Sequence, residues 1–173
     1  MAHQEQFEFV QEMRKRYPNN FKDSKVLEVG SLDINGSIRI FFENCDYTGL
    51  DIGEGKGVDI VCNGEEYDAP DNTFDTVISC ECFEHNPMWK ETFINMHRMT
   101  KSGGLVFFTC ATIGRPVHGT VDCDPDSSPF TNQYYRNLSS GDFTQCGLYD
   151  MFSDYMFYVN PQSADLYFYG VKK

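Results

Sequence analysis

Five short strand-forming segments most constrain how this chain can fold. They lie at 25–29, 46–51, 58–62, 74–80 and 105–110. Helical or turn-rich sequence separates them, which is typical of parallel strands joined by crossovers. Two aromatic-rich segments, 155–159 and 166–171, follow on either side of a turn-forming gap, as in a β-hairpin. The sequence therefore predicts an α/β fold with a doubly wound sheet, helices on both faces and a hairpin at one edge.

Apolar residues with a period of three to four predict the helices of this fold. The predicted helices are Gln4–Arg16, a helix beginning at Ser37, a helix from Asn86 to about Thr100, and a short one within 139–146. The stretch from Ala111 to Leu138 is long and irregular. A loop of this length in a compact domain is usually functional.

Charge and length limit the partners of the chain. Its 173 residues suit one domain, and 14 Lys and Arg face 26 Asp and Glu, for a net charge of -12. Nucleic acids and anionic membranes bind clustered cations, so we expect neither as a partner. No apolar run approaches the roughly 20 residues of a membrane span. We expect a monomer or homodimer.

The seven cysteines bear on the cellular compartment of the protein and on whether it binds a metal ion. Met1–Gln6 has neither the cationic nor the apolar region of a secretory signal, so we expect free thiols and a cytoplasmic protein. The one close pair is Cys80 and Cys82, whose spacing is tighter than that of zinc ligands, and no second pair completes a site. We therefore expect no metal.

Open α/β sheets bind ligands beyond the carboxyl ends of their strands. After the first strand, Gly30 permits close approach of a ligand to the backbone. Asp51 ends the second strand, where an acid can accept hydrogen bonds from ribose hydroxyls. Each residue also has a plainer interpretation: Gly30 as a strand-end turn, and Asp51 as the cap of a turn with Gly53. Together they favour a nucleoside site.

The loop after the first strand favours a cationic ligand over a dinucleotide. The dinucleotide fingerprint Gly-x-Gly-x-x-Gly needs a second glycine, where this chain has Leu32. Asp33 would repel a pyrophosphate, and Glu28 adds a further negative charge. An acidic pocket suits the sulfonium and ammonium groups of S-adenosylmethionine, so an NAD-dependent oxidoreductase or epimerase is a weak alternative.

Several motifs in order resemble those of the class I S-adenosylmethionine-dependent methyltransferases, over about residues 25–110. These motifs are Val26–Ser31, Tyr47–Ile52, Asp71–Val77, Glu84–His85 and Lys101–Leu105. The resemblance implies a Rossmann-like, seven-stranded sheet of order 3-2-1-4-5-7-6 with the last strand antiparallel. It also implies a single domain: an N-terminal helical segment (1–24), a cofactor-binding core (25–110), an acceptor-side loop and helix (111–147) and a C-terminal hairpin (148–173).

The resemblance further implies a set of cofactor-binding residues at four strand ends. The set is Glu28, Gly30 and Ser31 beside the methionine moiety, Asp51 and Ile52 at the ribose and adenine, Cys62, Asn63 and Gly64 at the adenine edge, and Ser79, Cys80 and Glu81 below the methyl group. The product would be S-adenosylhomocysteine. Asn63 stands where many relatives carry an Asp.

Methyl transfer needs proximity and, for some acceptors, a base. The candidate bases are His118 and His85, with Glu81 less favoured. Arg115, Tyr134, Tyr135 and Arg136 are candidate acceptor contacts, because the segment after the fifth strand borders the acceptor side in this architecture. We expect a small polar acceptor, sugar-related or a carboxylate. A non-catalytic module that binds the cofactor is the alternative.

Overall fold

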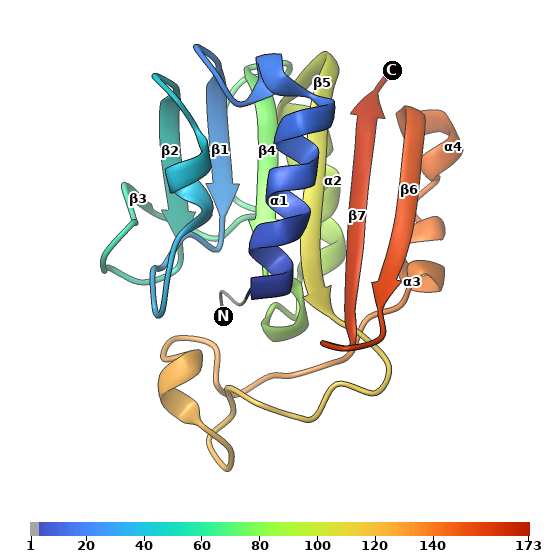
Figure 1. The fold of residues 1–173 in the computed structure, drawn as a ribbon. Helices are drawn as coiled ribbons and strands as arrows, with labels where there is room; N and C mark the ends of the chain where they lie inside the picture. The colour runs from blue at the N-terminus through green and yellow to red at the C-terminus, as the bar shows by residue number, and fades with distance from the viewer. Residues whose placement is uncertain (1–3) are drawn as a thin grey trace.

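A seven-stranded sheet organises residues 4–173, the part of the chain that the computed structural model describes (Figure 1). The strands are β1 (Lys25–Val29), β2 (Asp46–Asp51), β3 (Ile60–Val61), β4 (Phe74–Cys80), β5 (Thr100–Ala111), β6 (Phe152–Asn160) and β7 (Asp165–Lys172). Their order is β3-β2-β1-β4-β5-β7-β6, with β7 antiparallel to both neighbours. The predicted sheet order is confirmed.

Helices cover both faces of the sheet, as predicted. Helix α1 (Gln4–Arg16) lies on one face, and α2 (Trp89–Met99), α3 (Ser140–Thr144) and α4 (Leu148–Met151) lie on the other (Figure 1). Each face has its own apolar core: Val10 and Met13 of α1 join one, and Phe93 of α2 and Phe143 of α3 join the second. Four 3-10 turns complete the elements of residues 4–173: η1 (Pro18–Asn20), η2 (Ile38–Phe41), η3 (Phe83–His85) and η4 (Pro125–Ser127).

The prediction of a helix from Ser37 is wrong, because the chain forms only the 3-10 turn η2 there. The Ser37 hydroxyl accepts a hydrogen bond from the Arg39 backbone N–H at 3.1 Å, which caps the turn. Phe42 is already extended, and its ring stacks on Phe21 with centroids 4.4 Å apart. Aromatic packing therefore ends the helical conformation after one turn.

Two other boundaries differ from the prediction. Strand β3 contains only Ile60 and Val61, since Val58 belongs to a turn closed by its N–H on the Gly55 carbonyl. Strand β5 begins at Thr100, directly after α2, and so is longer than the predicted 105–110. The Asn86 side chain accepts a hydrogen bond from the Met88 N–H, and α2 begins one residue later.

The chain between β5 and α3, residues 112–139, crosses beneath the carboxyl ends of β1 and β2 and then returns to α3 (Figure 1). We call it the cap segment. It is tied to η3 by the Arg136 N–H, which donates to the Glu84 carbonyl at 2.8 Å. Its Phe130 ring lies so close to Gly53, after β2, that a Cβ there would be 2.1 Å from the ring. The cap segment therefore forms a wall of any site at this edge.

Among residues 4–173, no helix combines the length and apolar character that a membrane crossing requires. All seven cysteines are free, as predicted. The signal-sequence prediction for the N-terminus falls partly on residues 1–3, which lie outside the described residues.

Candidate functional site

A cleft of about 370 Å³ lies at the carboxyl ends of β1, β2 and β4. Its volume falls within the range of small-molecule sites. The cap segment, from Ser127 to Tyr134, and the turn η2 supply further walls. The cleft occupies the position that the switch-point rule selects in an open α/β sheet.

Gly30 connects β1 to the floor of the cleft. Its φ is +81°, a conformation that favours glycine, and a Cβ there would lie 2.6 Å from the Cβ of Cys82. The sequence argument expected a ligand to approach this backbone. In the structure the side chain that needs the space is Cys82, which also lines the cleft.

Asp51 lies at the end of β2, on the cleft wall. Its Oδ2 accepts a hydrogen bond from the Leu32 N–H at 3.1 Å, and its Oδ1 a long one from the Gly53 N–H at 3.4 Å. Partial burial raises the pKa of this carboxyl. Asp51 therefore caps the turn with Gly53, as its plainer interpretation expected, and it also lines the cleft.

The cleft is acidic, with carboxylates from Glu28, Asp51, Glu65 and Glu81 and no Lys or Arg among its described lining residues. Glu28 is 5% exposed and accepts a hydrogen bond from the Tyr47 hydroxyl at 2.8 Å. Burial raises the pKa of Glu28 to about 7. Such a cleft disfavours a pyrophosphate and favours a ligand that brings a positive charge.

The role expected of Asp33 needs correction. This carboxylate pairs with Lys56 at 2.6 Å and accepts the Gly36 N–H at 2.7 Å. The Lys56 ammonium lowers the pKa of Asp33, although burial opposes the shift. Asp33 does not belong to the described lining of the cleft, so it contributes turn geometry rather than repulsion of a ligand.

Nearly all of the predicted cofactor-binding residues line the cleft. Those lining it are Glu28, Gly30, Ser31, Asp51, Ile52, Cys62, Asn63, Gly64, Cys80 and Glu81. Ser79 is fully buried within β4 and does not line it. The sequence analysis missed lining residues from η2, from the start of α2 and from the cap segment. Among them are Ile38, Met88, Ser128, Phe130 and Thr131. An exposed aromatic in a polar loop, Phe130, was the one available signal for them.

The predicted acceptor contacts divide into two groups. Tyr134 lines the cleft. Arg115 pairs instead with the fully buried Asp165 of β7 at 3.1 Å, and Arg136 pairs with Asp142 of α3 at 2.5 Å. The Tyr135 hydroxyl donates to the Asn137 side chain at 2.7 Å. These three side chains hold the cap segment in place, outside the described lining of the cleft.

The two candidate bases are neighbours. His85, in η3, lines the cleft, and the His118 ring in the cap segment packs edge-on against it with centroids 5.3 Å apart. Tyr135 contacts both rings. Burial, aided by His118, lowers the pKa of His85 to about 4, and burial also lowers the pKa of His118.

The fold and the cleft define a Rossmann-like α/β domain with an acidic nucleoside-type site. Residues 27–108 match the family model described as "Methyltransferase domain". This region, just under half of the chain, is similar to the methyltransferase domain family, and the sheet order is the one that the resemblance to class I S-adenosylmethionine-dependent methyltransferases implied. No curated protein matches its sequence significantly.

Solved structures share the fold at low sequence identity. Haemonchus contortus phosphoethanolamine N-methyltransferase 2 matches in two complexes, one with phosphomonomethylethanolamine and S-adenosylhomocysteine (TM-score 0.67, 18% identity) and one with S-adenosyl-L-methionine (0.65, 16%). Each match covers 95% of this chain and 52% of that one, so the chain spans about half the length of the Haemonchus enzyme. The 1,6-didemethyltoxoflavin-N1-methyltransferase of Burkholderia thailandensis matches with TM-score 0.62 and 13% identity, covering 100% of this chain and 92% of that one.

Proposed function

We propose that the protein binds S-adenosylmethionine in the acidic cleft and transfers its methyl group to a small polar acceptor. The observation that carries the proposal is the charge of the cleft: four carboxylates and no Lys or Arg among the described lining residues, at the strand ends of a methyltransferase fold. Neighbours of the same fold are methyltransferases crystallised with this cofactor or its product.

The lining residues suggest how the cofactor lies. The carboxylate of Asp51 faces the cleft beside Ile52, where it can accept hydrogen bonds from the ribose hydroxyls. Glu28 is more buried, near the end of β1, and its carboxylate can pair with the ammonium group of the methionine moiety. Methyl transfer then requires an acceptor atom held in line with the sulfonium, which is mainly a matter of positioning.

The acceptor enters, in this proposal, at the end of the cleft formed by His85 and Tyr134. A histidine with a pKa of about 4 is a poor proton acceptor near neutral pH, because a base works best when its pKa lies near the working pH. We therefore assign His85 to holding the acceptor rather than to general base catalysis. Sugar-related molecules and small carboxylates remain the proposed acceptor classes.

Isothermal titration calorimetry tests the cofactor assignment directly. S-adenosylhomocysteine should bind with micromolar or better affinity at one site per chain, and NAD should not bind measurably. Binding of NAD instead would contradict the proposal. Transfer of label from methyl-labelled S-adenosylmethionine across an acceptor library then tests activity, and tight binding with no turnover would identify a non-catalytic module.

A further inference from the structure

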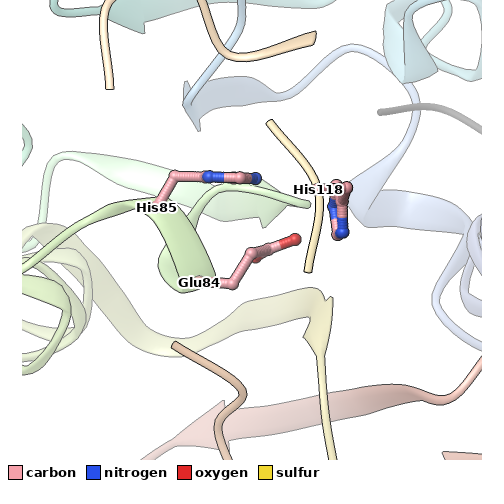
Figure 2. A group of neighbouring side chains, drawn as sticks. All are labelled: Glu84, His85 and His118. Carbon is pink, nitrogen blue, oxygen red and sulfur yellow. The ribbon is translucent and has the colours of Figure 1, made fainter. Parts of the chain in front are cut away.

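Three possible metal-ligating side chains converge beside the cleft, at the acceptor end. Glu84 and His85 come from η3, directly after β4, and His118 comes from the cap segment. Figure 2 shows the Glu84 carboxylate and the His85 ring both extending toward His118. One ligand atom from each residue lies within 4.8 Å of the others. Folding alone brings these two segments together.

Four atoms of this cluster are buried without a hydrogen-bond partner in the described part of the chain. They are both carboxylate oxygens of Glu84, Nδ1 of His85 and Nε2 of His118. Glu84 is fully buried and His85 is 5% exposed. A buried carboxylate is costly unless it is paired, protonated or bound to a metal. The cluster therefore offers two carboxylate oxygens and two ring nitrogens that no other described group occupies.

The histidine rings are arranged to present lone pairs to the cluster. Nδ1 of His118 lies 3.0 Å from the Pro116 carbonyl, which can only accept, so Nδ1 carries the proton and Nε2 is free to ligate. A backbone partner on the second nitrogen is the usual support of a metal-bound histidine. His85 offers a second nitrogen of this kind, because its Nδ1 is buried and accepts or donates no hydrogen bond within the described part of the chain.

We propose that Glu84, His85 and His118 form a binding site for a divalent transition-metal ion of the Zn²⁺ type. Two imidazole nitrogens and one carboxylate oxygen are a donor set that suits Zn²⁺ and Fe²⁺ rather than Ca²⁺. Three protein ligands leave a coordination position open. In a tetrahedral site with bonds of about 2.1 Å, ligand atoms lie about 3.4 Å apart. The separations between the three atoms would shorten by at most about 1.4 Å, and His118 lies in a loop rather than in a helix or strand.

The sequence argument against a metal considered only the cysteines, and this donor set uses none of them. Its place suggests a role that rests on the proposed function. His85 is both a proposed ligand and a wall of the cleft, so an ion held there would lie beside the acceptor end. The ion would hold an oxygen atom of the acceptor there and orient it toward the cofactor. This favours acceptors that carry a hydroxyl or carboxylate group.

Cobalt is the probe for the test, because Co²⁺ occupies Zn²⁺-type sites and reports its ligands by absorption. The full chain, stripped with EDTA and dialysed, is titrated with CoCl₂ in the absence of cofactor. One equivalent should bind with micromolar or tighter affinity and give d–d bands without a thiolate charge-transfer band. His118→Ala and Glu84→Gln should each weaken binding by about 100-fold or more. His97→Ala is the matched control, because His97 lies in α2 against the Met151 carbonyl and should leave binding unchanged.

Several results would overturn the site: substoichiometric or millimolar binding, a thiolate band, or variants that bind Co²⁺ as the parent chain does. Thermal melting shows whether each variant folds, and His118→Ala, in a loop, remains informative if Glu84→Gln does not fold. The cofactor proposal is tested separately, since S-adenosylhomocysteine should bind the EDTA-treated protein within about threefold of its affinity for the Co²⁺-loaded form. If the parent chain binds S-adenosylhomocysteine but not Co²⁺, the metal site is contradicted and the cofactor proposal is not.

Discussion

Asp51 tests the ribose end of the cleft. Its carboxylate faces the cleft while accepting one backbone hydrogen bond of ordinary length. Asp51→Ala should remove charge-assisted ribose contacts and weaken S-adenosylhomocysteine binding by about 1.5–3 kcal/mol, measured by calorimetry. Asp46→Ala, at the exposed amino end of the same strand, is the control and should bind normally. Equal affinities for both variants would remove Asp51 from the site.

Glu28 should make cofactor binding depend on pH. Its pKa of about 7, raised by burial above the ordinary 4.5, means that it is protonated in the free protein at pH 5.5. The ammonium group of S-adenosylhomocysteine binds the ionised form better, so affinity for this ligand should rise about tenfold or more from pH 5.5 to 7 and level off above. Glu28→Gln should flatten the profile, and Glu12→Gln, on the exposed side of α1, should not. A parent profile without slope contradicts this assignment.

Two glycines with similar backbone angles separate steric from conformational effects. Gly30 has φ +81° and Gly103 has φ +75°, but only at Gly30 would a Cβ meet a neighbour, Cys82, at 2.6 Å. Gly103→Ala should cost about 1–2 kcal/mol of unfolding free energy for the left-handed conformation. Gly30→Ala should cost about 1–3 kcal/mol more through overpacking, measured by urea denaturation. Similar losses at both positions would show that the Cys82 contact relaxes easily.

The residues that sequence reasoning placed well are those whose chemistry depends on strand ends. Asp51 and Glu28 could be predicted because β1 and β2 are short, so the sequence shows where each strand stops, and the sheet rule predicts that residues at these ends lie together. The pairing of Arg115 with Asp165 was not predictable, because it joins the cap segment to β7 across the fold. The Glu84, His85 and His118 cluster escaped for the same reason.

The sequence-based prediction was least accurate for the connection between β1 and β2. A period of three to four at Ile38, Phe41 and Phe42 predicted a helix, yet tertiary packing of Phe42 on Phe21 left one 3-10 turn. Helix α1 agreed with prediction because its periodic pattern is long, and the strands β1, β2 and β4 have the predicted bounds. Short amphipathic runs lack enough turns for their periodicity to outweigh local packing.

The cap segment should contribute to cofactor binding as well as to the acceptor side. Phe130 lines the cleft and packs against Gly53, next to Asp51 and Ile52. Phe130→Ala should weaken S-adenosylhomocysteine binding by about 0.5–1.5 kcal/mol, the usual scale of an aromatic contact, with little loss of stability because the ring is 49% exposed. Val121→Ala, an exposed side chain of the same segment outside the lining, is the control for calorimetry.

Retained affinity in the Phe130→Ala variant would place the cap segment on the acceptor side alone. That result would match the sequence-based expectation, in which the segment after the fifth strand borders the acceptor side. The structure favours the other outcome, because the crossing beneath β1 and β2 carries Ser128 and Thr131 into the cleft with Phe130.

At the scale of the whole molecule, the reactivity of each thiol should reflect how deeply it is packed in the fold. Cys123 is exposed, whereas Cys110 in β5 is fully buried and burial raises its pKa. Burial also raises the pKa of Cys82 to about 12. Titration with a disulfide reagent should therefore count seven thiols in denaturant and show Cys123 as the fastest to react in the native protein. A denatured count of five or fewer would mean disulfides, and an unchanged fast phase in Cys123→Ser would contradict the packing.

Strand β7 follows every other strand in the sequence but lies inside the sheet, between β5 and β6. Its side chains Leu166 to Tyr169 are almost wholly buried, with contributions to both cores. During synthesis, β1 to β6 therefore leave the ribosome before β7, the strand that joins β5 to β6 in the sheet, has been synthesised. The nascent chain must wait with an open, hydrogen-bonding edge on β5, so we expect the native sheet to close only after β7 has left the exit tunnel, and chaperones that shield β edges to matter most in that interval.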